Sequence, residues 1–393
     1  MRILHTADLH LGQILYQYYE RTDEHDHFFA QLTDWCHEYH PDALLVSGDL
    51  FDIQQPGAAV KAYFNRTFAD LHRQLPDMAI IATAGNHDSA SRIEADRAVW
   101  ALSGVTLAGN TPAVVALPAG FVVAVPFMAV YHPEAVQALL DQVATQNTDG
   151  LPVVLMAHLA VAGSDFTGHG DIGTLRTLPP QALGQGYDYA ALGHIHRPQT
   201  LAHPFDMADT SATLPAPLIR YSGSPLHVSC DEQYPHSVSL VDIDTHGGTV
   251  TVKPLRIDEL RHFYILPDYG HPAATSADEL YTLLSEFCHQ NPRGYIRLRV
   301  DSRTALPTDF QQAAYRILEA TGNEVRYNPN ILWENLQQDT PSSERPLFEV
   351  PELQQMADPL DFIRKTIDQY PEFDINDLEA DFAEVERELH NNQ

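Results

Sequence analysis

Residues 43–52 read ALLVSGDLFD, an apolar run that passes directly into a Gly-Asp turn. The run is too short for a helix, so it predicts a buried strand that ends in carboxylate side chains. Similar short apolar runs occur at 79–82, 121–125, 153–156 and 189–192. The stretches 24–39 and 57–75, on either side of the first run, show the apolar spacing of amphipathic helices. This alternation predicts an α/β fold with buried strands.

The pattern along the chain predicts three parts. Two runs at 237–243 and 249–252 flank a Gly-Gly pair and predict an antiparallel hairpin that closes an α/β domain over residues 1–255. Residues 256–340 predict a small α+β domain, because a strictly alternating strand at 295–300 lies between helix-start patterns at 276–279 and 308–311. Residues 341–393 predict a Pro- and Ser-rich linker and two short, acidic amphipathic helices. The apolar stripe of these helices favours a partner-binding tail over a merely solvated one.

Composition limits the class of protein. Hydrophobic residues make up 44% and charged residues 19% of the 393 residues, as in ordinary globular proteins. No apolar run is long enough to span a membrane, and no apolar leader follows Met1. The three cysteines lie far apart, without a CxxC pair. These features predict a soluble cytoplasmic protein without a zinc–thiolate module.

The net charge argues against simple nucleic-acid binding. The chain has 23 Lys and Arg residues against 53 Asp and Glu residues, a net charge of −30. Proteins that hold nucleic acid by neutralising phosphates are expected to show a basic face. Any contact with nucleic acid must therefore depend on a concentrated patch, on bound metal or on a partner.

Metal-ligand residue types follow the ends of five predicted strands. In chain order they are Asp8 and His10, Asp49 and Asp52, Asn86 to Asp88, His158, and His194 and His196. Because sites in open α/β sheets form beyond the carboxyl ends of the strands, these side chains can converge. Oxygen and imidazole donors without sulfur suit divalent ions such as Mn, Fe or Zn. Two such ions that share one carboxylate can promote displacement at phosphorus.

Each of these motifs is weak evidence by itself. A lone DxH or HxH match is common in a chain with 21 histidines, and GDxxD also occurs as an ordinary turn after a strand. The GNHD segment at 85–88 is sharper, because a His-Asp pair on a loop is dispensable for folding. All five motifs in order, each directly after an apolar strand, favour a dinuclear metal centre.

The order DxH, GDxxD, GNHD, H and GHxH resembles that of the calcineurin-like metallophosphoesterase superfamily. One branch, the SbcD nuclease subunits, is similar to HTADLHLG at 5–12, GDLFD at 48–52, GNHDS at 85–89, ALGHIHR at 191–197, YSGSP at 221–225 and Asp231-Glu232. Position 9 is often Trp in that branch and is Leu here. The resemblance is specific over about residues 1–235. It implies a two-sheet αββα sandwich with a small α+β capping domain and a C-terminal helical tail.

For the site, the resemblance implies two divalent metal ions, usually manganese. One ion would be held by Asp8, His10, Asp49 and His196, and the other by Asp49, Asn86, His158 and His194. His87 would protonate the leaving oxygen or stabilise the phosphorane, and Asp88 would orient His87.

The resemblance further implies a DNA nuclease subunit that acts in DNA repair, recombination and replication. Its activities would be a double-strand 3'-5' exonuclease and a single-strand or hairpin endonuclease. The capping domain would contact DNA through Arg297, Arg299 and Arg293, for which an ordinary exposed strand face is the alternative. The tail would bind the coiled-coil ATPase subunit SbcC, and the helices after Asp52 and Asp88 would form a homodimer. Two rivals remain, a phosphoesterase for a small-molecule or protein substrate and a non-catalytic scaffold.

Overall fold

The computed structural model describes residues 1–168, 177–201 and 211–334. Residues Met1–Glu334 form one compact unit. The expected domain boundaries near residues 255 and 340 stay predictions, and the expected linker and tail helices at 341–393 lie outside the described residues. Among the helices of the described ranges, none is both long and apolar enough to cross a membrane.

Two mixed sheets build most of this unit. The seven-stranded sheet has the order β12-β15-β14-β1-β4-β5-β6, with bounds Ala212–Pro215, Thr249–Arg256, Ser237–Ile243, Arg2–Thr6, Ala43–Ser47, Ala79–Thr83 and Val105–Ala108. The six-stranded sheet has the order β11-β13-β10-β9-β8-β7, with bounds Gln199–Thr200, Leu218–Tyr221, Tyr189–Gly193, Val153–His158, Gly120–Val125 and Ala113–Leu117. A short hairpin of β2 (Ile14–Leu15) and β3 (Tyr19–Glu20) follows β1. Strands β1, β4 and β5 are parallel in one sheet, as are β9 and β10 in the other.

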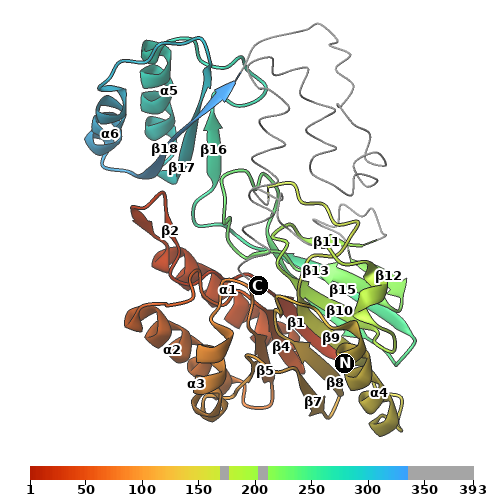
Figure 1. Cartoon of the computed structure of the whole chain (residues 1–393). Helices are drawn as coiled ribbons and strands as arrows, with labels where there is room; N and C mark the ends of the chain where they lie inside the picture. The colour runs from red at the N-terminus through yellow and green to blue at the C-terminus, as the bar shows by residue number, and fades with distance from the viewer. Residues whose placement is uncertain (169–176, 202–210, 335–393) are drawn as a thin grey trace, which may run out of the picture. The chain divides into compact units, whose positions relative to one another are not determined.

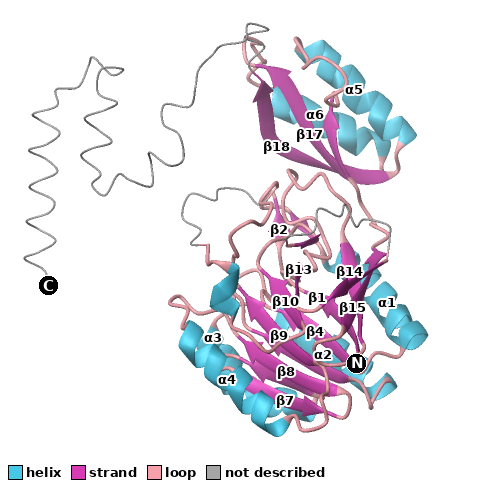
Figure 2. Cartoon of the chain, turned by 90° about the vertical axis from the view of Figure 1, so that its right-hand side faces the viewer, coloured by secondary structure: helices cyan, strands magenta, loops and turns pink. Residues whose placement is uncertain are grey.

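Helices cover the outer face of each sheet. Helices α1 (Thr22–Tyr39), α2 (Ala58–Gln74) and α3 (Ala90–Leu102) pack on the seven-stranded sheet. Helix α4 (Pro133–Gln146) and the 3₁₀ helix η1 (Pro180–Leu183) pack on the six-stranded sheet. Figure 1 shows the strands between the two helical layers, and Figure 2 shows them from the side. The expected αββα sandwich is confirmed.

The central strands bury both of their faces. In β4, Leu45 packs between the two sheets, while Leu44 and Val46 pack against α1, α2 and α3. In β9, Val154 packs between the sheets and Leu155 packs against α4. Strands buried on both sides need continuous apolar runs, which is the pattern that the sequence shows at these positions.

Residues 263–334 form a smaller substructure, here called the α+β unit. Its parallel sheet has the order β16-β17-β18, with bounds Phe263–Leu266, Arg293–Asp301 and Glu324–Glu334. Helices α5 (Ala277–Gln290) and α6 (Phe310–Thr321) pack on this sheet. The helix-start pattern at Ser276 is confirmed, because its Oγ accepts from the backbone N–H of Glu279 at 3.3 Å. The second pattern correctly predicts a helix start, because α6 begins at Phe310, but its capping box is wrong: Asp309 is the N-cap residue and its side chain makes no capping hydrogen bond.

The α+β unit bonds to the body of the sandwich through β17 and β18. The expected alternation of β17 is confirmed, with Leu298 in the core beneath α5 and α6 and Tyr295 on the opposite face. The buried Tyr295 hydroxyl donates to Oε2 of Glu24 in α1 at 2.8 Å. Arg326 of β18 donates to the carbonyl of Glu20 at 3.0 Å. The face of β17 that carries Tyr295 is therefore covered in part by the sandwich.

Candidate metal centre

The ends of five strands bring the expected side chains together at one edge of the sandwich. Asp8 and His10 follow β1, Asp49 follows β4, Asn86 and His87 follow β5, His158 ends β9, and His194 and His196 follow β10. These eight residues are here called the strand-end site. Strands β1, β4 and β5 belong to one sheet and β9 and β10 to the other, so the site draws on both sheets.

Ligand-type atoms of the strand-end site form overlapping clusters, in each of which one donor atom per residue lies within 4.8 Å of the others. The clusters are Asp8–His10–His196, Asp49–His158–His194 and His10–Asp49–His87. Oδ2 of Asp49 lies 3.4 Å from Nε2 of His158 and 3.8 Å from Nε2 of His10. Oδ1 of Asn86 lies 2.9 Å from the same nitrogen of His158. The Asp49 carboxylate thus lies between two groups of donors, as a ligand shared by two ions must.

The loops of the site hold unusual backbone conformations. Asp8, His10, Asp49 and His194 have positive φ angles of 54°, 44°, 47° and 95°. Such conformations cost about 1–3 kcal/mol each and persist only where the surrounding structure enforces them. Here the N–H of Asp8 bonds to the carbonyl of Gly48 at 3.0 Å, and the N–H of His10 bonds to the carbonyl of Asp49 at 3.1 Å. Strain concentrated at four ligand-type residues is typical of a functional site.

Two glycines leave room for the ligands. A Cβ atom on Gly48 would lie 2.1 Å from Nδ1 of His158, and one on Gly85 would lie 2.1 Å from Oδ1 of Asp49. No side chain fits at either place, so the glycines of the GDxxD and GNHD motifs are required by the close approach of the ligands.

Hydrogen bonds on the far side of two imidazole rings orient them. Nδ1 of His158 lies 2.8 Å from the carbonyl oxygen of Ser47, and Nδ1 of His196 lies 2.8 Å from Oε1 of Glu232. Because these oxygens accept, each Nδ1 carries a hydrogen and leaves Nε2 as the ligand atom. Glu232 is fully buried. The sequence motifs gave Glu232 no role, and its only signal was its place in the Asp231-Glu232 segment of the resemblance.

Charges within the site favour uptake of a cation. Burial acts to raise the pKa of Asp49, but His158 and His10 outweigh it and hold that pKa well below its usual range. Burial acts to lower the pKa of His158, but the carboxylates of Asp49 and Asp8 raise it to about 9. In the metal-free chain an ionised Asp49 is thus paired with an imidazolium, and a cation that binds there displaces a proton from His158.

His10 gives the clearest sign that the residues fit a metal ion. Both of its ring nitrogens are buried and have no hydrogen-bond partner among the described residues. Carboxylate oxygens of Asp52 and Asp49 lie 3.3 and 3.8 Å from them. Buried polar atoms are nearly always paired. With Nδ1 beside the Asp52 carboxylate, Nε2 is the nitrogen that a metal ion would complete. With carboxylate, amide and imidazole donors around it, the site fits divalent cations.

Asp88 contacts partners other than the expected one. Its buried carboxylate accepts from the backbone N–H groups of Leu50 and Phe51, both at 3.0 Å, and of Gly85 at 2.8 Å. The expectation that Asp88 orients the His87 ring is therefore wrong. Asp88 joins the loop after β4 to the loop after β5, because it satisfies three backbone donors that no strand pairs.

His87 is held by two other contacts. Its backbone N–H donates to Oδ1 of Asp49 at 2.8 Å, and Nδ1 of its ring lies 2.9 Å from the carbonyl oxygen of Asp52. The ring is exposed, unlike the buried His10 and His158. His87 is thus the member of the strand-end site that is open to an incoming substrate.

The three arginines of β17 differ in their contacts. Arg299 is 3% exposed, and its guanidinium donates to the carbonyls of Pro267, Asp268 and His271 and to Oε2 of Glu334. Arg297 donates to the carbonyl of Asn330 and to Oδ1 of Asp231, both at 3.0 Å. Arg293 is exposed at the start of the strand. The expectation that Arg299 contacts DNA is corrected, since its donors are engaged within the α+β unit.

Known proteins are similar to this chain. A family model described as Calcineurin-like phosphoesterase matches residues 1–198. The SbcD subunit of the SbcCD nuclease of Rhodobacter capsulatus is 32% identical over 283 residues, which cover 62% of this chain and 66% of that protein. The SbcD subunit of Escherichia coli K12 is 30% identical over 65% of this chain and 68% of its own length. The SbcD subunit of Bacillus subtilis is 29% identical over 78% of this chain and 81% of its own length. A solved phosphopantetheinyl hydrolase from Mycobacterium tuberculosis aligns over 69% of this chain and 98% of its own, with 13% identity and a TM-score of 0.29, too low a similarity to carry an argument.

The alignments span about two thirds of the length of the Rhodobacter and Escherichia relatives. The residues matched by the family model cover half of this chain and contain the whole strand-end site. The chain belongs to the calcineurin-like phosphoesterase family and, within it, to the SbcD nuclease subunits.

Proposed function

We propose that the chain hydrolyses phosphodiester bonds of DNA at the strand-end site with two divalent ions, and that these ions are manganese. One ion is held by Asp8, His10, Asp49 and His196, and the other by Asp49, Asn86, His158 and His194. The observation that carries the proposal is the convergence of these donors on Asp49 from five strand ends, beside a buried His10 ring whose nitrogens have no hydrogen-bond partner among the described residues.

The site is built to act without rearranging. When bound, the two ions polarise a phosphoryl oxygen and supply hydroxide from water at neutral pH. Ser47 and Glu232 hold the rings of His158 and His196 in one orientation, and the paired loops hold Asp49 at the centre. Groups fixed in place before the reaction stabilise developing charge at no further reorganisation cost.

His87 is the proposed general acid. The carbonyl of Asp52 accepts from Nδ1, so Nε2 is the ring atom that can deliver a proton to the leaving oxygen. The exposed ring can also stabilise the charge of the phosphorane. Removing a general acid typically lowers the rate by about 10²–10⁴-fold.

DNA binding in a chain of net charge −30 depends on local positive charge. Two divalent ions outweigh the two carboxylates of Asp8 and Asp49, so the loaded site attracts a phosphate. Arg297 and Arg293 are the proposed phosphate contacts on the α+β unit. The location of Arg297 supports this: it contacts Asp231, which precedes Glu232, the partner of His196. A phosphate would have to compete with Asp231 for the Arg297 guanidinium. Metal-free protein should bind DNA poorly.

The relatives are SbcD subunits of SbcCD nucleases by name. By analogy, we propose double-strand 3'-5' exonuclease and single-strand or hairpin endonuclease activity in DNA repair, recombination and replication. The partner is a coiled-coil ATPase, SbcC, bound by residues 341–393. A cytoplasmic location is supported by three cysteines that form no disulfide, as expected in a reducing compartment.

A homodimer through α2 and α3 is also proposed. Val99 and Leu102 on α3 are 59% and 88% exposed, and Ile53, ahead of α2, is 57% exposed. Exposed apolar side chains of this size support an interaction surface. Leu102→Glu should convert a dimer into a monomer in light scattering after size exclusion, with the metal content unchanged. Persistence of the dimer would argue against α3 as the interface.

The nuclease proposal is tested by hydrolysis of linear double-stranded DNA with Mn²⁺ or with EDTA. His87→Ala is compared with His289→Ala, a matched control because His289 is exposed at the end of α5, outside the strand-end site. We expect degradation that requires Mn²⁺, that falls by about 10²–10⁴-fold in His87→Ala and that is unchanged in His289→Ala.

Cleavage that continues in EDTA, or equal rates in both variants, would contradict the proposal. DNA that survives even with the ATPase partner present, while a small phosphodiester is cleaved, would select the small-substrate rival. The comparisons with known proteins favour the nuclease over that rival.

A further inference from the structure

A second cluster of ligand-type side chains lies outside the strand-end site. His227, Glu232 and His236 are 7%, 0% and 0% exposed, and one donor atom of each lies within 4.8 Å of the others. Nδ1 of His227 is 3.2 Å from Nε2 of His236, which in turn is 3.6 Å from Oε2 of Glu232. None of the metal ligands expected from the sequence motifs belongs to this cluster.

The opposite nitrogens of the two rings show where their hydrogens are. Nδ1 of His236 lies 2.6 Å from the carbonyl oxygen of Ser224, and Nε2 of His227 lies 3.1 Å from Oε1 of Glu259. A carbonyl and a carboxylate only accept, so both of these ring nitrogens carry hydrogens.

In two neutral rings, the nitrogens that face each other across 3.2 Å are then both lone-pair atoms. This arrangement needs a positive charge, which is either one additional proton or a cation. A proton shared by two nitrogens needs no further ligand, whereas the Glu232 carboxylate supplies a third donor. Each ring also donates its other N–H to an oxygen, the pattern that metal-ligating histidines show.

The distances match a tetrahedral ion. Zinc–nitrogen bonds of about 2.0–2.1 Å separate two ligands on one tetrahedron by about 3.3–3.4 Å. The separations of 3.2 Å and 3.6 Å within the cluster bracket that value. Two imidazoles and a carboxylate are also a donor set that zinc accepts, with the fourth position taken by water.

We propose that Nδ1 of His227, Nε2 of His236 and Oε2 of Glu232 bind a third divalent ion of the zinc type, separate from the two ions of the strand-end site. This inference depends on the geometry of the cluster alone and not on the nuclease activity.

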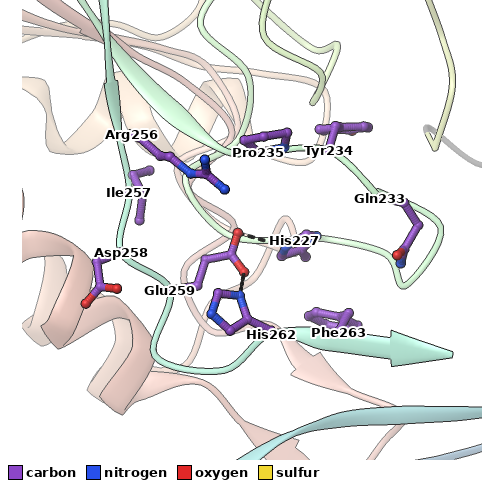
Figure 3. A pocket seen from close by; sticks show the side chains of 10 residues that line it. All are labelled: His227, Gln233, Tyr234, Pro235, Arg256, Ile257, Asp258, Glu259, His262 and Phe263. Atoms are coloured by element: carbon purple, nitrogen blue, oxygen red, sulfur yellow. Dashed lines mark hydrogen bonds and ion pairs between the residues drawn. The ribbon is translucent and has the colours of Figure 1, made fainter. Parts of the chain in front are cut away.

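One ligand of the cluster, His227, lines a cavity of about 500 Å³. Figure 3 shows His227, Asp258, Glu259 and His262 on its wall. Glu259 contacts the rings of His227 and His262. Its carboxylate oxygens lie 3.1 Å from Nε2 of His227 and 2.7 Å from Nδ1 of His262. The wall of the pocket carries two carboxylates, Asp258 and Glu259, and one cation, Arg256, so its charge favours the approach of a cation to His227.

Glu232 connects the cluster to the strand-end site. Its Oε1 accepts from Nδ1 of His196 at 2.8 Å, and its Oε2 lies beside Nε2 of His236. An ion at the cluster therefore fixes the carboxylate that orients the His196 ring. Glu232 serves the third site as a ligand and the first as a positioning residue.

Zinc content decides between an ion and a shared proton. The full chain is stripped with a chelator, loaded with Zn²⁺, freed of unbound ion and measured by elemental mass spectrometry. Wild type and the control His289→Gln should hold one ion per chain more than His236→Gln or His227→Gln. Equal zinc content in all four proteins would overturn the third site. A lower zinc content in His10→Gln reports on the strand-end site. Failure of the third-site proposal is therefore distinguishable from failure of the proposed function at the strand-end site.

Cobalt spectroscopy covers the case in which the cluster variants do not fold. Co²⁺ in a tetrahedral site gives stronger visible bands than Co²⁺ with five or six ligands. We expect such bands in the Co²⁺-loaded wild type and in His10→Gln, in which the cluster is intact. Their absence from both proteins would show that the two rings share a proton instead.

Discussion

His10 of the strand-end site and Arg299 of the α+β unit are both buried, but they differ in their hydrogen bonds. Both ring nitrogens of His10 lack a hydrogen-bond partner among the described residues, and four ligand-type residues of the site have positive φ angles. In the α+β unit, Ser276 caps α5, and the buried Arg299 guanidinium donates to three carbonyl oxygens and a carboxylate. Orphaned groups and strained backbone cost free energy, so folding alone would not retain the first arrangement. Substitutions in the two regions should therefore separate activity from stability.

The largest effect is expected at the centre of the strand-end site. Asp49→Asn keeps the size of the side chain but removes the charge shared by two groups of donors. Manganese-dependent DNA cleavage should fall by about 10³-fold, the upper value for loss of one preorganised electrostatic group. The thermal midpoint in EDTA should fall modestly, because His158 loses its ionised partner and gives up its additional proton. A variant that loses its fold as well as its activity would break the contrast between the two regions.

The next effect concerns Glu232, which orients a ligand without being part of the strand-end site. Glu232→Gln weakens the charge-assisted bond to Nδ1 of His196. Loss of such a partner typically lowers metal affinity or activity by about 10–100-fold. A Mn²⁺ titration of the nuclease rate should shift to higher concentration, with a smaller loss at saturating Mn²⁺. An unshifted titration would mean that His196 does not depend on Glu232 for its orientation.

A substitution in the α+β unit should lower stability and leave nuclease activity unchanged. Arg299→Met leaves the carbonyls of Pro267 and Asp268 without their donor in a buried place. We expect a loss of about 1–3 kcal/mol in the free energy of unfolding by urea. Nuclease activity at low temperature should be unchanged. Arg316→Met, at an exposed position on α6, is the matched control and should change stability little.

The smallest effect is expected at Arg293, an exposed residue at the start of β17. If Arg293 contacts a phosphate, Arg293→Ala should reduce the slope of log binding constant against log salt concentration by about 1. Arg316→Ala, at an exposed position on α6, should leave the slope unchanged. Equal slopes in wild type and both variants would remove Arg293 from the DNA contacts.

The residues of the strand-end site could be predicted from the sequence, because each follows or ends an apolar strand. Asp49 and His158 needed only the rule that strand ends meet at one edge, and the structure places them 3.4 Å apart. The hydrogen-bond partners that hold these residues in place could not be predicted from the sequence. Glu232 orients His196 from 36 residues away, and Asp88 bonds to Leu50 from 38 residues away. Contacts of that separation leave no local period in the chain.

The same limit explains the correction at Arg299. Strict alternation along β17 correctly placed Arg299 on the face opposite the α5 and α6 core. Alternation does not tell whether a second layer covers that face, and here the segment from Pro267 to His271 does so. The cluster of His227, Glu232 and His236 was missed because its histidines follow no strand end and match no ligand spacing among the motifs considered.

The origin of the ligands in two different sheets has a consequence for the lifetime of the protein. Asp49 follows β4 of the seven-stranded sheet and His158 ends β9 of the six-stranded sheet, so an ion bound by both would be a cross-link across the sandwich. The two sheets cannot separate while that ion stays bound, which slows unfolding and the protease attack that follows it. Metal supply would then set how long this protein survives in a cell, as well as how fast it cuts.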